Sequence, residues 1–295
     1  MKIRPFWVIL VLTGILWVAN LAYAQSQKLD QPIFVDHYVD MWWEESPFLQ
    51  FYYLANKEDR SIVQSVELGD WLGSPEWGID SEIAEVDQFG RYSLRRVTVQ
   101  FNHLPEIQEQ QIFHEVTVHF SESPSTVAQI GRIVVHPPSD GTSPFNDNTH
   151  SSGDYDKSQL IPGEVVTVES IHTSFDELLQ NQFFMKAYSP KLRLLSKPLA
   201  DGMRDFKEKY WQEAPGVDVR TVEFPFELQQ GEPLIVSSTA DLKFRAVMDI
   251  DIELIGETAT KEPFKEKVGY ISYPQFTKQE IQQLIEKRTK AVPNE

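Results

Sequence analysis

The chain of 295 residues contains no cysteine. Because thiolates are the attacking groups of cysteine enzymes and common ligands of structural zinc, thiol catalysis and thiolate metal sites are excluded. Disulfides are excluded too, so an exported form of this protein must depend on its hydrophobic core alone. The sequence also lacks an Asn-x-Ser/Thr acceptor for N-glycosylation. Together these absences favour a bacterial exported protein over an animal ectodomain.

Local catalytic motifs are missing as well. The sequence has no Gly-x-Ser-x-Gly elbow, no phosphate-binding loop and no dinucleotide fingerprint. His114 and His119 resemble a zinc-protease pair, but they are five residues apart instead of four, and Val118 occupies the required position. A Ser/His/Asp triad is assembled from distant residues, so the sequence cannot test for one. We therefore assign no catalytic residue and expect no cofactor.

Positive charge is scarce. The chain has 27 Lys and Arg residues against 44 Asp and Glu residues, which gives a net charge of −17. The first 24 residues hold Lys2, Arg4 and no acid, so residues 25–295 carry −19. Charge of this sign argues against nucleic acid and anionic lipid as partners, and is compatible with cationic ones.

A long apolar run occurs only at the N-terminus. Lys2 and Arg4 precede the apolar stretch Phe6–Leu21, which ends at Ala22-Tyr23-Ala24. This order predicts a secretory signal peptide over residues 1–24. The run is also barely long enough to cross about 30 Å of hydrocarbon, so a retained N-terminal membrane anchor is the alternative. Both interpretations place residues 25–295 outside the cytoplasm, with membrane contact only through the N-terminal segment.

Alternation of apolar and polar residues predicts strands through most of the remaining chain. The clearest example is Phe244–Ile255, where Met248, Ile250, Ile252 and Leu254 alternate with acidic residues. A hairpin is expected from Phe48–Leu54 and Ser61–Leu68. Further strands are expected at Arg96–Phe101, His114–Phe120, Gln129–His136, Val219–Leu228, Pro233–Ser237 and Val268–Tyr273.

These patterns predict a mostly β protein with two antiparallel β-sandwich-like domains, at residues 28–140 and 160–275. Residues 141–159 are predicted to be a linker or long loop because they are nearly all polar and follow Pro137 and Pro138. The second domain is expected to carry helical insertions, from Ser174 to about Phe184 and over Pro198–Gln212. A capping box at Thr277–Glu280 predicts a C-terminal helix over 277–291. The alternative is a single α+β domain.

Three groups of residues are weak candidates for a site. Trp42, Trp43, Trp71 and Trp77 combine flat apolar rings with acids and turns, and could bind a partner or stay in the core. Asp147, Asp154 and Asp156 could form an irregular calcium site, although Gln159 and Val165 replace the glycine and glutamate of an EF-hand loop. Asp249, Asp251 and Glu253 are expected to line an exposed sheet face.

Two function classes remain open. The first is an exported or membrane-tethered non-enzymatic surface or envelope protein that binds a protein or polymer partner, which includes a subunit of an envelope complex. The second is an exported hydrolase that acts on cell-wall or extracellular polymer. A cleft with converging acids, or a Ser/His pair of perturbed ionisation, would favour the hydrolase.

Overall fold

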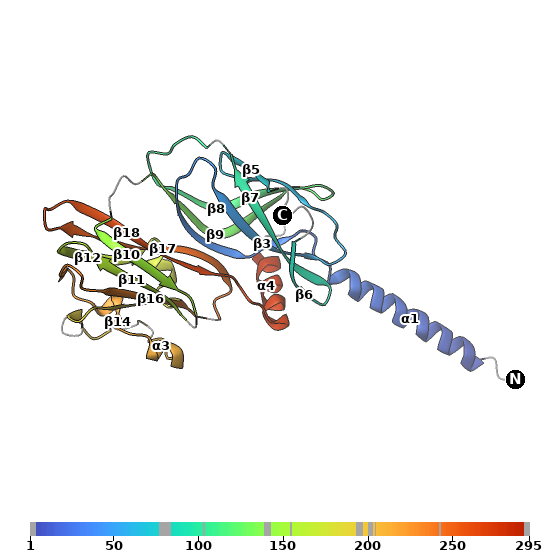
Figure 1. The fold of residues 1–295 in the computed structure, drawn as a ribbon. Helices are drawn as coiled ribbons and strands as arrows, with labels where there is room; N and C mark the ends of the chain where they lie inside the picture. Colours follow the sequence, from blue (N-terminus) through green and yellow to red (C-terminus); the bar gives the residue numbers. More distant parts are fainter. Residues whose placement is uncertain are drawn as a thin grey trace.

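The computed structural model describes residues 4–76, 84–102, 104–138, 143–153, 155–192, 197–199, 203, 205–241 and 243–291. The protein is mostly β, with two sheets and a C-terminal helix, as the sequence predicts. One sheet has thirteen strands and the other has five. A long N-terminal helix projects away from this β-rich body (Figure 1).

The projecting helix α1 spans Arg4–Ser26. Its described apolar side chains from Leu10 to Tyr23 are exposed, with Trp17 the most open at 71%. The base of the helix is held by the body, because Arg91 Nη1 donates to the Ala24 carbonyl at 2.6 Å and Tyr92 Oη donates to the Gln27 carbonyl at 2.6 Å. Among the residues whose side chains are described, no helix is both long and apolar enough to cross a membrane.

The N-terminal half of the body is a curled part of the large sheet. Its strands follow the order β1-β3-β7-β5-β4-β8-β9-β2, and β6 pairs with the start of β7 along the edge that β5 occupies further on. A core that includes Phe51, Val99 and Phe101 fills the inside. The strands are β1 (Ile33–Phe34), β2 (Asp36–Trp42), β3 (Phe48–Asn56), β4 (Val63–Leu68), β5 (Trp71–Pro75), β6 (Ala84–Phe89), β7 (Tyr92–Phe101), β8 (Gln111–Phe120) and β9 (Thr126–His136).

One chain segment joins the two ends of this curl. β1 pairs with β3, and after Val35 the same segment crosses over as β2 and pairs in parallel with β9. The buried His37 fills the gap at the crossover: its Nδ1 donates to the Val35 carbonyl at 2.7 Å and its Nε2 accepts from the Tyr52 N–H at 3.1 Å. Gly131 faces it with φ of 82°, and a Cβ there would lie 2.7 Å from the His37 carbonyl, so only glycine fits.

The C-terminal half is a sandwich of two sheets. Strands β18, β17, β12 and β15 belong to the large sheet and face the small sheet, whose order is β10-β11-β16-β13-β14. The core between them includes Leu160, Val236, Ile250 and Leu254. The strands are β10 (Phe145–Ser151), β11 (Asp156–Pro162), β12 (Val166–Thr173), β13 (Phe183–Tyr188), β14 (Val217–Asp218), β15 (Phe226–Leu228), β16 (Leu234–Ala240), β17 (Ala246–Thr258) and β18 (Pro263–Ser272).

The two halves share the large sheet through β17. Residues 246–249 of β17 pair in parallel with residues 36–39 of β2 before the strands diverge. The strand pairs are antiparallel as predicted except at β2, which pairs in parallel with both of its neighbours. Strand periodicity does not carry this information, because alternation looks the same in both pairings.

The segment predicted to be a linker, 141–159, contains β10 and the start of β11. Its polar composition has a physical reason: β10 is an edge strand with a single neighbour, so little of it needs to be apolar. The assignment of residues 28–140 and 160–275 to separate domains stays a prediction.

The inserted helices are shorter than expected. α2 spans only Asp176–Leu179, because the chain enters β13 at Phe183 and pairs with β16 there. In the second region, α3 spans Lys209–Glu213 and residues 205–208 are not helical. Much of the range 193–204 lies outside the described residues.

The C-terminal helix α4 spans Lys278–Ala291 and confirms the predicted capping box. The Glu280 carboxylate accepts from the Thr277 N–H at 2.7 Å, and the Thr277 hydroxyl accepts from the Glu280 N–H at 3.3 Å. Phe276 and Ile281 lie on the two sides of the cap, at the positions of a hydrophobic staple, and both are buried against the outside of the N-terminal half.

Candidate functional site

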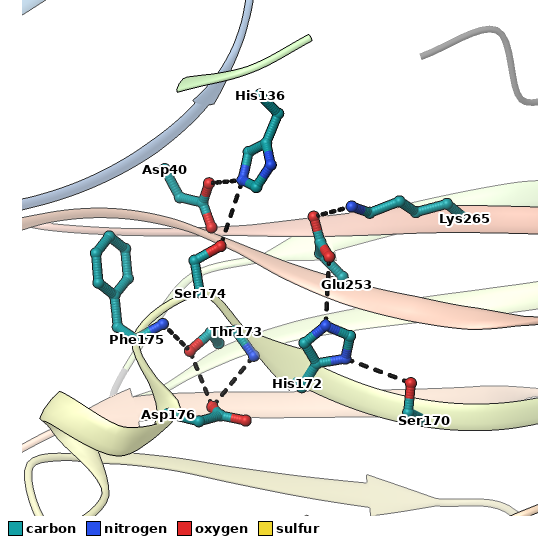
Figure 2. A network of polar contacts seen from close by, with 10 residues as sticks. All are labelled: Asp40, His136, Ser170, His172, Thr173, Ser174, Phe175, Asp176, Glu253 and Lys265. Atoms are coloured by element: carbon teal, nitrogen blue, oxygen red, sulfur yellow. Dashed lines mark hydrogen bonds and ion pairs between the residues drawn. The ribbon is translucent and has the colours of Figure 1, made fainter. Parts of the chain in front are cut away.

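A cluster of charged and aromatic side chains lies where β2 and β17 diverge. Figure 2 shows part of it, with Asp40 beside His136 and with Glu253 between His172 and Lys265. The cluster combines acids and bases from five strands, and the pKa values of His172, Asp251, Glu253 and Lys267 are all shifted from their usual values. We call it the junction cluster and define it by Asp40, Trp42, His136, His172, Asp251, Glu253, Lys265 and Lys267.

The sheet register explains how these residues meet. His172 of β12 and Lys267 of β18 are the Cα partners of Glu253 on the two sides of β17. Directly paired residues of adjacent antiparallel strands point to the same face, so the three side chains gather on one surface. Trp42 pairs with His136 at the end of β2 and stacks on it, with ring centroids 5.0 Å apart.

Glu253 is held as a buried anion. It is 3% exposed, with Oε1 2.5 Å from Lys265 Nζ and Oε2 3.4 Å from His172 Nε2. Burial raises the pKa of this carboxyl, but the hydrogen bonds from His172 and Lys265 outweigh burial and bring the pKa down to about 2. The same bond to Glu253 raises the pKa of His172. Glu253 is therefore a counterion that fixes two bases.

The pKa of Asp251 is shifted in the opposite direction, upward. Burial is the largest cause that raises this pKa, and together with the charges of Asp40, Asp249 and Glu253 it brings the pKa to about 6 against the opposing effect of Lys267. Lys267 Nζ lies 3.7 Å from Asp251 Oδ2 and 3.5 Å from the centre of the Trp42 ring. The ammonium is thus shared between a carboxylate and an aromatic face.

Asp40, His136 and Ser174 resemble a catalytic triad by composition, but their geometry is different. His136 Nε2 lies 2.5 Å from Asp40 Oδ1 and 3.3 Å from the Ser174 hydroxyl. In a triad the acid and the nucleophile contact opposite ring nitrogens, so that the ring passes a proton between them. Here both contact the same nitrogen, as Figure 2 shows, so this arrangement cannot relay a proton from Ser174.

The row of acids on β17 is only partly exposed. Asp249 is exposed, Asp251 is half-buried and Glu253 is buried. The prediction of an exposed sheet face is therefore wrong at Glu253, because the end of β2 and the lysines of β18 cover it. No signal in the β17 sequence alone could identify these partners, since they come from β2, β9, β12 and β18.

Of the predicted calcium ligands, the structure describes only the side chain of Asp156, so the calcium site stays a prediction. Asp156 is 8% exposed at the start of β11, whereas Asp154 and the side chain of Asp147 lie outside the described residues. Within the described ranges, no three or more His, Asp or Glu side chains are grouped to hold a metal ion. His114 and His119 contact different partners, the Gly131 carbonyl and Glu67.

The four candidate tryptophans have separate environments. Trp42 belongs to the junction cluster, and Trp43 Nε1 donates to the Pro105 carbonyl at 3.0 Å. Trp71 is 5% exposed and packs against Phe101 and Phe113 in the core, so its ring is not available to a large ligand. Trp77 lies outside the described residues.

A groove of about 850 Å³ lies elsewhere, on the N-terminal half beside the base of α1. One wall is the segment 26–34, the second is the start of β9 at Thr126–Gln129, and the third is α4 with Gln282, Ile285, Glu286 and Arg288. No residue of the junction cluster lines this groove. Its volume is within the range of roughly 300–1,000 Å³ that is usual for ligand sites.

Comparisons with known proteins do not assign a family. No protein-family model matches the chain, and no curated protein matches it. Among solved structures, the chain is similar to the C-terminal domain of the Streptococcus pyogenes antigen I/II-family protein AspA. The identity is 10% over 82% of this chain and 99% of that chain, with a TM-score of 0.19. A likeness at this score carries no argument about function.

Proposed function

We propose that this chain is an exported or membrane-tethered, non-enzymatic surface or envelope protein of bacteria that binds a protein or polymer partner. The observation that carries the proposal is α1. Its described apolar side chains, including Ile15, Leu16 and Trp17, are each more than half exposed. A large exposed apolar surface marks contact with a membrane or with another protein, and in an exported protein processing can also remove such a helix. The cations before it and the small residues at its end support export in either case.

The body supports a binding role in place of catalysis. The acids and bases of the junction cluster neutralise one another in pairs, and His136 contacts Asp40 and Ser174 through a single nitrogen. These contacts suit a rigid joint between the two halves. A groove of ligand size lies at a different place, next to the base of α1.

An exported hydrolase remains the second candidate, and one observation favours it. Asp251 and Glu253 are two residues apart on β17, with pKa values of about 6 and about 2. Environments that separate the pKa values of two neighbouring carboxyl groups in this way are common in the acid–base pairs of enzymes. If this class is right, Asp251→Asn and Glu253→Gln each abolish hydrolysis of a cell-wall polymer by the purified chain.

Cell fractionation with N-terminal sequencing tests the proposal. The full chain, tagged at its C-terminus, is expected in the membrane or outside the cell, with residues 1–24 either retained or removed at Ala24. Leu16→Arg is expected to hold the chain in the cytoplasm, because a charge in the middle of the apolar run opposes insertion. Leu72→Arg, at a similarly exposed leucine of β5, is the matched control and should leave export unchanged. Recovery of the wild-type chain with Met1 intact from the cytosol would contradict export.

A further inference from the structure

The start of β9 has an open edge. Residues 126–129 of β9 pair with β8 on one side, while β2 pairs with the other side only from Gly131 onward. β1 contacts β9 but forms no ladder with it among the described strands. The backbone groups of Thr126–Gln129 that point away from β8 therefore face the groove beside α4, and Ile130 is the last residue before the ladder with β2 begins.

This edge differs from the outermost strands of the two sheets in the residues that it carries, because it has neither a charge nor a proline, whereas β10 for example carries Asp147. Edge strands usually carry charges or prolines, or are very short, because an open ladder invites pairing with another chain. β18 carries Lys265, Glu266 and Lys267, β6 carries Glu85 and Asp87, and β14 and β15 have only two and three residues. By contrast, the open stretch of β9 reads Thr-Val-Ala-Gln-Ile, with no charge and no proline.

The side chains around the edge alternate as a strand requires. Thr126 and Ile130 are buried, whereas Val127 points outward with 61% of its surface exposed. Across the groove, the half-buried Leu29, Ile33 and Ile285 offer apolar contacts. An extended peptide beside β9 would meet backbone groups along one side and apolar side chains at alternate positions along the other.

The charges indicate the sign of the occupant. The groove itself is balanced, with Lys28 and Arg288 against Asp30 and Glu286. The surrounding chain carries a net charge of −17. A body of this charge attracts cationic segments and repels acidic ones over several ångströms of solution.

We propose that the groove binds an extended, net positively charged segment of a partner protein, which adds to the sheet as a strand along Thr126–Ile130. This inference rests on the proposed binding function and names the kind of partner that the protein takes. Strand addition gains affinity from main-chain hydrogen bonds, and the pockets for alternate side chains give specificity.

Selection of displayed nine-residue peptides on the full chain in detergent micelles tests the proposal. Retained peptides are expected to be net positive, with apolar residues at every second position, and to slow amide hydrogen exchange at Thr126–Ile130. Val127→Lys adds a protecting charge at an exposed position and should weaken binding of the selected peptides by about fivefold or more.

Ile271→Lys is the matched control, since Ile271 is 54% exposed on the edge strand β18. It should leave peptide affinity unchanged, and thermal unfolding verifies that both variants fold. Failure to retain peptides, protection mapped away from Thr126–Ile130, or equal effects of the two variants would overturn the strand-addition site. Such a result leaves the fractionation outcome untouched, so the failure of this inference is separable from failure of the proposed function.

Discussion

At the scale of single residues, the sequence shows charged and aromatic residues but not their ionisation. His37 is an example, because it looks like an ordinary polar position in a strand. Burial lowers the pKa of His37 to about 4, and its two hydrogen bonds fix the neutral ring at the crossover between β1 and β2. Its role depends on Val35 and Tyr52 being brought together by the curl of the sheet.

The first prediction concerns acid stability. In the unfolded chain His37 takes up a proton near pH 6.5, whereas in the folded chain it stays neutral until about pH 4. The stabilisation from the neutral ring is therefore present above pH 6.5 and is lost as the pH falls toward 4. The loss should be on the order of 3 kcal/mol, from about 1.4 kcal/mol per pKa unit.

Urea unfolding at a series of pH values measures this effect. His37→Gln should have a lower free energy of unfolding at pH 7. Between pH 6.5 and pH 4 its free energy of unfolding should fall much less than that of the wild type. His150→Gln, at an exposed histidine on the edge strand β10, serves as the control and should follow the wild-type profile. Parallel profiles for the wild type and His37→Gln would disprove the assignment.

The second prediction contrasts two acids of the junction cluster. The folded-state pKa of Asp251 is raised to about 6, so the folded chain binds the extra proton and gains stability as the pH falls from about 6 to 4. Asp251→Asn should remove that gain and cost little at pH 7. Glu253 has a lowered pKa of about 2, so its stabilisation is present above pH 4.5 and is lost toward pH 2.

Glu253→Gln should therefore affect stability in the opposite way, with its main loss at neutral pH. It should cost about 3 kcal/mol at pH 7, because it leaves Lys265 and His172 without their buried partner. Chemical unfolding of both variants at pH 5 and pH 7 checks the comparison. Equal losses for the two variants at pH 7 would contradict the different roles of the two carboxyl groups.

At the scale of helices and strands, an element is predicted correctly when the residues that determine it are close together in the sequence. The capping box of α4 involves only Thr277 and Glu280, three positions apart, and its prediction is confirmed. The helix expected from Ser174 to about Phe184 forms only over Asp176–Leu179, because residues 183–188 pair with β16, which lies about fifty residues away. Local propensity cannot anticipate such pairing. The same holds for β10, whose polar sequence predicts a loop.

The third prediction concerns the docking of α4. Ile281 is 1% exposed and belongs to the cluster that includes Val35, Tyr52 and Val247. Ile281→Ala should lower the free energy of unfolding by roughly 2–4 kcal/mol, since a buried large side chain is removed. Ile281→Val should cost only about 1 kcal/mol. Denaturant titration measures both values, and a loss below 1 kcal/mol for the alanine variant would show that α4 is not firmly docked.

At the scale of the whole molecule, the alternation of residues predicts the fold class but not its connectivity. The sequence indicates a mostly β chain with a C-terminal helix, and the structure has both. The parallel contacts of β2 with β9 and β17 were not predictable, because they join segments about 90 and 210 residues apart. The junction cluster was missed for the same reason: Asp40 and His136 come from strands of one half, while His172, Asp251 and Glu253 come from the other.

The fourth prediction follows from the shared strand. Because β17 pairs with β2 and also forms the core of the C-terminal sandwich, the two halves should unfold together in one calorimetric transition. The calorimetric and van't Hoff enthalpies should agree. Two resolved transitions would show that the halves are independent folding units, as the sequence-based division into two domains implies.

The attachment of α1 has a consequence for geometry. Leu29 and Asn56 exchange two hydrogen bonds, of 3.0 and 2.8 Å, immediately after the contacts of Arg91 and Tyr92 with the base of the helix. Almost no free linker therefore separates α1 from the body. If the helix stays in the bilayer, the body cannot swivel freely above it, and the groove bounded by Ser26 and Gln27 opens at the level of the lipid headgroups. A partner strand would then have to approach along the plane of the membrane.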